Sequence, residues 1–258
     1  MSLDLEHIEV VDTDYGRIVC NTYDNAQTPF FKITRKAINH TEIVMLHGML
    51  DRFFGLSNGN SLIVDIGSHI GTYPMYFTKN SKVKHVFSFE PISRLCLMQK
   101  ESYTLNGITD KVTICNMALS DTASTLQIPI IDFSKPANFG GIEWGTEQIE
   151  NIGITVTKGT EQMETFTLDN VLELSPQSKT SGSKVIFIKI DVEGMEEQVL
   201  RGSVNTISKD RPLMFVEFLK SDQPSLLACL DQLGYTTKKM HTDFLCIPKG
   251  RTDILETL

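Results

Sequence analysis

The chain has 258 residues, of which 41% are hydrophobic, and it carries a formal net charge of −8. This length and composition suit one α/β domain with additions, or two small domains, with a full hydrophobic core. The acidic balance argues against a nucleic-acid binder, because contacts with phosphates need Lys and Arg, and against docking on an anionic membrane.

The cysteine content predicts free thiols. The count of five is odd and no CxxC pair occurs, so neither a disulfide framework nor a zinc site is expected. The N-terminal segment MSLDLEHIEV has no basic region and no long apolar run. No stretch of the chain approaches the roughly 18 apolar residues of a membrane helix. We therefore expect a cytoplasmic protein without a signal peptide or a membrane span.

From about residue 61 onward, short apolar strands alternate with helical patterns. The predicted strands are, in chain order, SLIVDIG, HVFSFE, KVTICNMAL, KVIFIKID and PLMFVEF, followed by a final pair, TTKKM and DFLCIP. Helices are predicted over 70–79 and 93–106, from about 193, and over 223–235. Continuous apolar strands separated by helices predict a doubly wound, mostly parallel sheet with helices on both faces. Ligands of such sheets bind outside the carboxyl ends of the strands.

Two segments lie outside this alternation. Residues 1–60 are predicted to form an N-terminal extension that packs on a main domain, residues 61–258, with an irregular stretch and a helix around 42–54. Residues from about 121 to about 165 form an insertion that contains PANFGGIEWG and the only tryptophan. A long insertion at the ligand edge of a parallel sheet predicts a substrate loop. The alternative is a surface excursion packed by its own Phe139 and Trp144.

The segment VDIGSHIGTY predicts a ligand-binding turn between a strand and a helix. Gly67 and Gly71 allow the backbone to approach a ligand closely, and Asp65 precedes them near the end of the strand. The dinucleotide fingerprint GxGxxG would place its second glycine at His69, where a bulky side chain disfavours a pyrophosphate. The alternative is a tight turn without a ligand.

The segment FSFEP places Glu90 at the end of the next strand, about 20 residues beyond the glycine turn. A carboxylate at this position can accept hydrogen bonds from both hydroxyls of a ribose, whereas the alternative is a surface glutamate. Together, the glycine turn and Glu90 indicate a nucleoside cofactor that lacks a pyrophosphate. S-adenosylmethionine meets this description.

The sequence resembles the FkbM-type S-adenosylmethionine-dependent methyltransferases. The motifs that carry the resemblance lie between about residues 61 and 218, in the family's order: VDIGSHIGTYPMYF, VFSFEP, CNMALSD, FTLDNVL, IKIDVEGMEEQVLRG and RPLMFVEF. The FEP and KIDVEG…VLRG elements are specific to the family, whereas class I methyltransferases in general share the glycine turn. The resemblance implies the Rossmann-like class I fold and methylation of a hydroxyl on a sugar, glycan or related natural product. The acceptor would then be a small molecule or a glycan.

The resemblance also implies roles for individual residues. The methionine end of the cofactor would be lined by Asp65, Gly67, Ser68, His69, Gly71 and Thr72. Glu90 would hold the ribose, and the adenine would be bordered by Ser120 and Asp121, or by the backbone at Met117 and Ala118. The acceptor loop would contain Asn138, Gly140 and Gly141. Asp191 and Glu193 would form the acidic pair of the active site, with Asp191 facing the transferred methyl group.

The acidic pair suits proton removal from an acceptor hydroxyl, which is a poor nucleophile until its proton leaves. Asp191 is the predicted general base, and its alternative role is the N-cap of the following helix. Glu193 is predicted to lie in the first turn of that helix, where a negative side chain also stabilises the helix dipole.

Two further residues are candidates for catalysis, Glu217 at the end of the fifth strand and His241 between the last two strands. Glu217 and Asp191, on adjacent strands, could bind a divalent cation through their oxygens, but two carboxylates do not specify a metal site. We therefore assign no metal ligands, and a divalent metal stays an alternative that the sequence does not indicate.

Three other functions stay open at this stage. The acceptor atom could be a nitrogen or a carboxylate oxygen, or the chain could bind the cofactor without catalysis. The missing GxGxxG disfavours an NAD-linked oxidoreductase. The sequence specifies neither the acceptor nor the oligomeric state.

Overall fold

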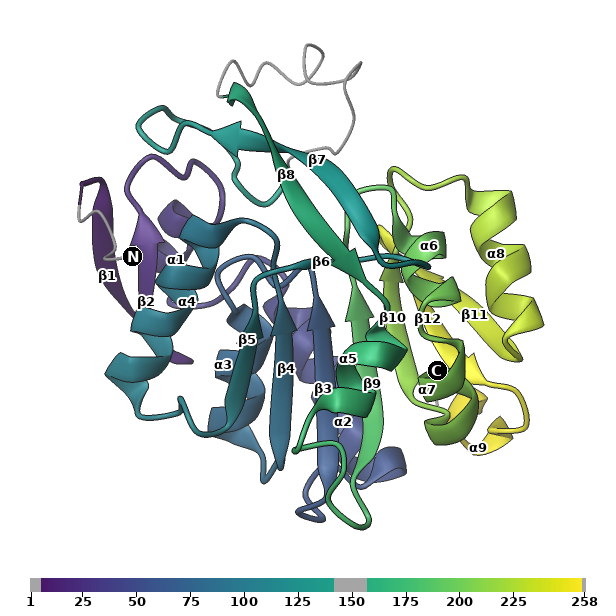
Figure 1. Ribbon diagram of the computed structural model, residues 1–258. Helices are drawn as coiled ribbons and strands as arrows, with labels where there is room; N and C mark the ends of the chain where they lie inside the picture. Colours follow the sequence, from purple (N-terminus) through teal and green to yellow (C-terminus); the bar gives the residue numbers. More distant parts are fainter. Residues whose placement is uncertain (1–5, 142–156, 257–258) are drawn as a thin grey trace.

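The computed structural model describes residues 6–141 and 157–256, and a seven-stranded sheet forms its centre (Figure 1). The strand order is β11-β12-β10-β9-β3-β4-β5. The strands are β3 (Ser61–Ile66), β4 (His85–Phe89), β5 (Val112–Cys115), β9 (Lys184–Ile190), β10 (Leu213–Glu217), β11 (Tyr235–Met240) and β12 (Asp243–Pro248). β3, β4, β5, β9 and β10 are parallel to one another, whereas β12 is antiparallel to both β10 and β11. The predicted doubly wound sheet is confirmed.

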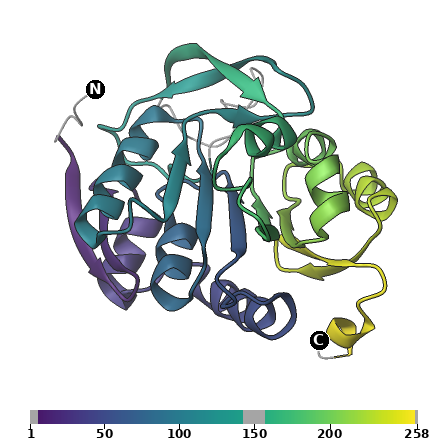
Figure 2. The same ribbon diagram turned by 60° about the horizontal axis from the view of Figure 1, so that its bottom comes forward.

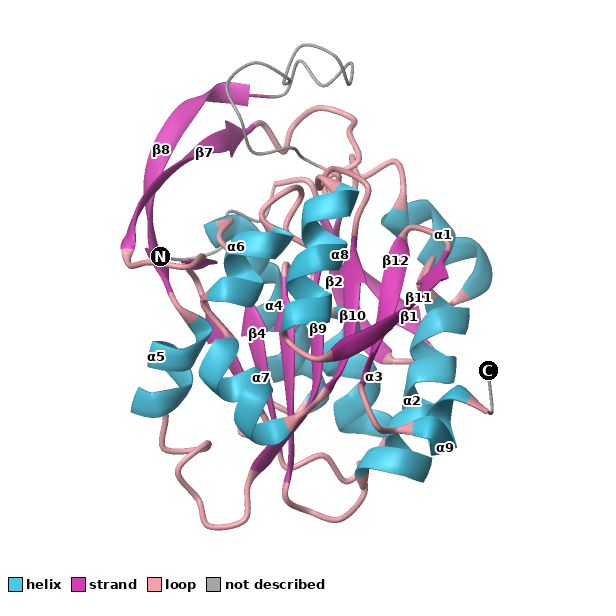
Figure 3. Ribbon diagram, turned by 90° about the vertical axis from the view of Figure 1, so that its right-hand side faces the viewer, coloured by secondary structure: helices cyan, strands magenta, loops and turns pink. Residues whose placement is uncertain are grey.

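Helices cover both faces of the sheet, which explains why its central strands read as continuous apolar runs (Figure 3). One face packs against α2 (His40–Phe54), α3 (Thr72–Asn80) and α4 (Ser93–Asn106), and the other against α5 (Leu168–Leu174), α6 (Glu196–Arg201), α7 (Val204–Asp210) and α8 (Gln223–Gln232). Neighbouring residues of β3 belong to different hydrophobic clusters, Ile63 to the first and Val64 to the second. Because successive strand residues point to opposite faces, every position of β3 is buried.

The strand order reverses between β3 and β9. From β3 the chain proceeds to β4 and β5 on one side, whereas β9 is followed by β10 on the other. The two central strands stay together beyond their ends, since the backbone N–H of Asp191 donates to the carbonyl of Ile66. A crevice at such a reversal is the usual ligand site of an open α/β sheet.

The third predicted strand is divided between two sheets. β5 ends at Cys115, and Ala118–Leu119 forms β6, which pairs with β8 (Thr157–Phe166) in a second sheet that also contains β7 (Ser124–Ile131). The side chain of Asn116 donates to the carbonyls of Glu90 and Pro91, which turns the chain away from β4. β7 and β8 pass above the carboxyl ends of the main strands (Figure 1). Trp144 and the rest of segment 142–156 lie outside the described residues.

The N-terminal segment is more regular than predicted. It forms a hairpin of β1 (Ile8–Thr13) and β2 (Gly16–Asn21), followed by α1 (Gln27–Thr34) and α2. This hairpin lies on the opposite side of the molecule from α9 (Thr252–Leu255) (Figure 2). The segment is also joined to the insertion by two hydrogen bonds. The N–H of Asn25 donates to the carbonyl of Ala137, and the N–H of Ala137 donates to the carbonyl of Tyr23.

The predictions about thiols and membrane spans can be compared with the described residues. All five cysteines are free and buried, as predicted. Within residues 6–141 and 157–256, no helix combines the length and the apolar character needed to cross a bilayer.

Candidate active site

A cavity opens at the carboxyl ends of β3, β4 and β9, where the strand order reverses. Its walls include Asp65 at the end of β3, Glu90 after β4, and Lys189 and Asp191 at the end of β9. Parts of the chain outside the central fold complete the walls: Gln27 and Asn39 of the N-terminal segment, Leu126 and Ile131 of β7, and Phe139 and Gly140 of the insertion. The cavity therefore lies between the sheet, the N-terminal segment and the insertion.

The glycine turn between β3 and α3 is tightly packed against the protein itself. Gly67 and Gly71 have φ angles of 77° and 80°, which favour glycine. A Cβ atom would lie 1.7 Å from the carbonyl oxygen of Asp191 at the first position, and 2.1 Å from the hydroxyl of Tyr103 at the second. The reason for these glycines thus differs from the predicted one, because protein atoms rather than a ligand occupy the space. Gly67 still lines the cavity, as do three of its predicted neighbours, Ser68, His69 and Thr72.

Asp65 is a buried carboxylate with no hydrogen-bond partner in the part of the chain that the structure describes. Its side chain is 1% exposed, and neither of its oxygens accepts a hydrogen bond from the described residues. Burial raises its pKa to about 7, an effect that Lys189 opposes and Asp191 reinforces. An unpaired buried carboxylate is costly, so a cationic group bound in the cavity would be stabilised beside it.

Glu90 is buried rather than on the surface, so the surface alternative is wrong. One carboxylate oxygen accepts the N–H of His69 at 2.8 Å, and the other accepts the N–H of Ile92 at 2.9 Å. Burial raises the pKa of Glu90 to about 8. Since each carboxylate oxygen can accept two hydrogen bonds, both retain capacity for a ligand donor.

The raised pKa values of Asp65 and Glu90 predict that stability falls as the pH rises. Both carboxyl groups ionise near pH 4 when unfolded, but the pKa values are about 7 and about 8 when folded. Folding therefore takes up protons in this window, and the free energy of unfolding is expected to decrease from about pH 5 to about pH 8. Urea denaturation at fixed pH steps measures this decrease. Glu90→Gln should make the dependence shallower, and an equally steep curve for this variant would contradict the assignment.

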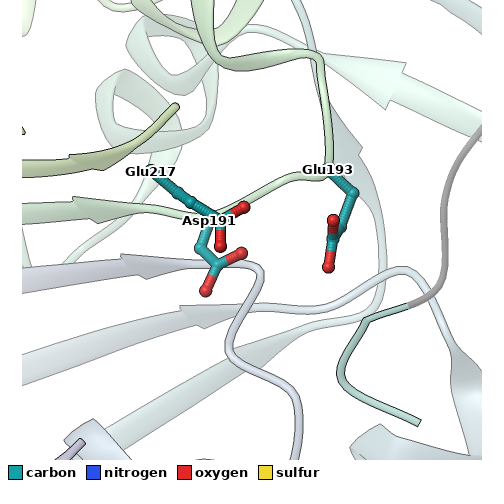
Figure 4. Close-up of side chains that lie close together, drawn as sticks. All are labelled: Asp191, Glu193 and Glu217. Carbon is teal, nitrogen blue, oxygen red and sulfur yellow. The ribbon is translucent and has the colours of Figure 1, made fainter. Parts of the chain in front are cut away.

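Three carboxylates meet beside the cavity, Asp191 and Glu193 from the end of β9 and Glu217 from the end of β10 (Figure 4). One oxygen of each lies within 4.8 Å of the other two. Two lysines partly balance this charge: the ammonium of Lys189 lies 2.7 Å from a carboxylate oxygen of Asp191, and Lys220 pairs with Glu193. The structure thus brings together three of the four predicted catalytic residues.

The backbone around Glu193 corrects two predictions. α6 begins at Glu196 and its N-cap is Met195, so Glu193 does not lie in the first helical turn and Asp191 does not cap the helix. Glu193 instead has a φ of 57°. The reason is Glu196, whose buried carboxylate accepts the N–H groups of Val192 and Gly194 and so holds the chain in a loop before the helix. Both carboxylates of the acidic pair are therefore free of helix-capping roles.

The environment of this acidic group favours proton uptake. Burial raises the pKa of Glu193 to about 7, although its bond to Lys220 opposes the shift. Burial, together with the charges of Asp191 and Glu193, also raises the pKa of Glu217. A base whose pKa lies close to the working pH is effective in general-base catalysis.

Sequence reasoning missed two residues beside this group. Lys189 is 5% exposed and interrupts the apolar strand KVIFIKID. A buried lysine needs a charged partner, so the position of Lys189 two residues before Asp191 could have indicated an ion pair at the site. Asp243 is also buried and lies opposite Glu217 in the pairing of β10 with β12. No local pattern indicated Asp243, because its position depends on an antiparallel pairing between distant segments.

Several predicted site residues lie away from the cavity wall. His241 is exposed at the turn between β11 and β12. Neither Ser120, whose hydroxyl donates to Asp121, nor Asp121 lines the cavity. The other predicted residues absent from its lining are Gly71, Asn138, Gly141 and Glu217, whereas Met117, Ala118 and Gly140 belong to it.

A doubly wound sheet that reverses its order beside a glycine turn, with a buried acid after the next strand, is the Rossmann-like arrangement expected of a class I methyltransferase. The family model of the methyltransferase FkbM domain matches residues 65–237. The chain belongs to this family.

Solved structures resemble the chain only distantly. Methyltransferase FkbM from Methylobacillus flagellatus KT is 16% identical with a TM-score of 0.47, over 73% of this chain and 42% of that one. The S-adenosylmethionine-dependent O-methyltransferase from Thermotoga maritima is 11% identical with a TM-score of 0.42, over 93% and 71%. Trm5b from Pyrococcus abyssi is 10% identical with a TM-score of 0.45, over 95% and 57%. The chain thus spans less than half the length of the first of these. No curated protein matches the sequence.

Proposed function

We propose that the chain is an S-adenosylmethionine-dependent methyltransferase that methylates a hydroxyl of a sugar, glycan or related natural product. The observation that supports it most is the position of three carboxylates, Asp191, Glu193 and Glu217, beside a cavity that Asp65 and Glu90 also line. Family membership supports S-adenosylmethionine as the methyl donor. The three carboxylates support an acceptor group, such as a hydroxyl, that must lose a proton.

The residues of the cavity fit the proposed cofactor. Asp65, with two unpartnered oxygens, can accept hydrogen bonds from the ammonium of the methionine part. Glu90, whose oxygens each hold only one backbone N–H, can accept the ribose hydroxyls. The apolar side chain of Ile92 and the segment at Met117 and Ala118 form the wall that would border the adenine.

When bound, S-adenosylmethionine supplies a methyl group on a sulfonium that is already activated toward a nucleophile, so positioning contributes much of the rate. Asp191 would accept the proton of the acceptor hydroxyl, and its pairing with Lys189 fixes the orientation of its carboxylate. Glu193 and Glu217, with raised pKa values, are the neighbouring groups that could take up the same proton.

The test is transfer of a labelled methyl group from S-adenosylmethionine to a panel of oligosaccharides, glycosides and nucleotide sugars. Treatment of the product with alkali separates the candidate reactions, because methyl esters are cleaved and methyl ethers are stable. Alkali-stable label on a hydroxyl would support the proposal. Label that is released by alkali, or that is found on an amine, would overturn the O-methylation part of it.

Removal of divalent metal ions is expected to leave methyl transfer unchanged. The three carboxylates have the type and spacing of oxygen ligands for such an ion. Lys189 and Lys220 already neutralise two of them, and a cation would have to displace these ammonium groups. Turnover measured in EDTA, with and without added magnesium, checks this expectation. Activity that is lost in EDTA and restored by magnesium would instead assign the three carboxylates as a metal site.

A further inference from the structure

Five buried polar atoms on the cavity wall have no hydrogen-bond partner among the described residues. They are both carboxylate oxygens of Asp65, the amide nitrogen of Gln27, the hydroxyl of Tyr73 and Nε2 of His69. Buried polar groups are normally paired, and each unpaired one costs stability. Their concentration around one cavity indicates a ligand with several polar groups of its own.

The chemistry of these atoms matches the two ends of an α-amino acid. Asp65 offers two acceptors to an ammonium group, and Gln27 and Tyr73 offer donors to a carboxylate. The amide of Gln27 has a defined orientation, since its oxygen accepts the N–H of Ile38 at 3.4 Å and its nitrogen is the unpaired end. Asp65 and Tyr73 both lie near Lys189, because Asp65 is paired with Lys189 between β3 and β9 and the Lys189 ammonium lies 5.4 Å from the centre of the Tyr73 ring.

Four backbone N–H groups of the glycine turn, those of Gly67, Ser68, His69 and Gly71, are already bonded within the protein. The N–H groups of Gly67 and Ser68 both donate to the carbonyl of Phe89, and that of Gly71 donates to the carbonyl of Ser68. The N–H of His69 donates to Glu90. These four groups are therefore not free to bind a carboxylate, which favours side-chain donors.

The N-terminal segment holds Gln27 firmly at the cavity. Gln27 is the first residue of α1, and the preceding turn is fixed by Asp24, whose carboxylate accepts the N–H groups of Ala26 and Thr28. The same turn is joined to the insertion at Ala137 through Asn25. Gln27 is therefore a fixed part of the wall.

We propose that Gln27 and Tyr73 bind the carboxylate of the methionine part of S-adenosylmethionine, beside the ammonium held by Asp65. This proposal rests on the proposed function. It makes the N-terminal segment a part of the cofactor site, although that segment lies outside the residues matched by the family model.

The test compares two nucleosides that differ only in the amino-acid part, S-adenosylhomocysteine and methylthioadenosine. Calorimetric titrations would use the variants Gln27→Ala and Tyr73→Phe. The controls are Gln232→Ala, at an exposed position of α8, and Tyr76→Phe, which removes a hydroxyl bonded to His47 outside the cavity. A hydrogen bond to a charged group strengthens binding by a factor of about 10 to 100. Gln27→Ala and Tyr73→Phe should each weaken S-adenosylhomocysteine by this factor and leave methylthioadenosine unchanged. The controls should bind both nucleosides like the wild type.

Three other results would overturn the proposal. Equal weakening of both nucleosides would place the effect in the nucleoside pocket or the fold. Unchanged affinity for S-adenosylhomocysteine, with a raised KM for the acceptor, would place Gln27 in the acceptor site. Either result would leave the proposed function intact, since the wild type would still bind S-adenosylhomocysteine. A wild-type protein that binds neither nucleoside would refute both.

Discussion

Replacing Asp191 by Asn is expected to lower the turnover number by about 10²–10⁴-fold, the range that general-base catalysis contributes. The amide keeps the shape of the side chain but cannot accept the proton of the acceptor hydroxyl. Affinity for S-adenosylhomocysteine should be retained, because Asp65 and Glu90 are unchanged. Labelled methyl transfer and calorimetry on the same preparation measure the two properties.

The turnover number of the Asp191→Asn variant must be calculated from the concentration of folded protein before it is compared with that of the wild type. Lys189 is buried and loses its charged partner, and removing one member of a buried ion pair is strongly destabilising. Asp222→Asn on exposed α8 is the matched control, since Asn caps a helix about as well as Asp. Full activity of Asp191→Asn would move the base to Glu193 or Glu217, which Glu193→Gln and Glu217→Gln would then distinguish.

Replacing Gly67 by Ala is expected to destabilise the protein by several kcal/mol and to abolish cofactor binding. The new Cβ would lie 1.7 Å from the carbonyl oxygen of Asp191, so β3 and β9 must separate at the site. The left-handed backbone adds about 1–2 kcal/mol. Urea denaturation and titration with S-adenosylhomocysteine measure the two effects.

Gly59→Ala is the matched control for this variant. Gly59 has a similar φ of 80°, but a Cβ there would meet nothing within 4 Å. This variant should therefore lose only about 1–2 kcal/mol for its backbone conformation. Equal losses for the two variants would show that contact with Asp191 is not what requires glycine at position 67.

The sheet and the acids at its edge could be predicted because their signals are local. An apolar run followed by Asp or Glu marks the end of a buried parallel strand, and this pattern located Asp65, Glu90 and Asp191 correctly at one edge. The helix after β9 was less predictable. Its start depends on which carboxylate binds the preceding N–H groups, and the sequence DVEGMEE offers both Glu193 and Glu196.

The walls supplied by distant segments could not be predicted. Gln27 reaches the cavity because the N-terminal turn pairs with Ala137, more than 100 residues away, and no periodicity encodes that pairing. The division of the third strand has a similar cause. β6 leaves the main sheet to pair with β8, and the sequence KVTICNMAL has the same apolar character on both sides of the break.

The central claim is that the cavity between β3, β4 and β9 binds S-adenosylmethionine. Calorimetric titration of the wild type and of Glu90→Gln with S-adenosylhomocysteine and with NAD tests it most directly. The wild type should bind one S-adenosylhomocysteine with a Kd in the micromolar range and should not bind NAD, because His69 stands where the dinucleotide fingerprint has its second glycine. Glu90→Gln should weaken S-adenosylhomocysteine about tenfold or more, because an amide group replaces one of the two oxygens that accept the ribose hydroxyls. Binding of NAD, or an affinity for S-adenosylhomocysteine that Glu90→Gln leaves unchanged, would contradict this assignment of the cavity.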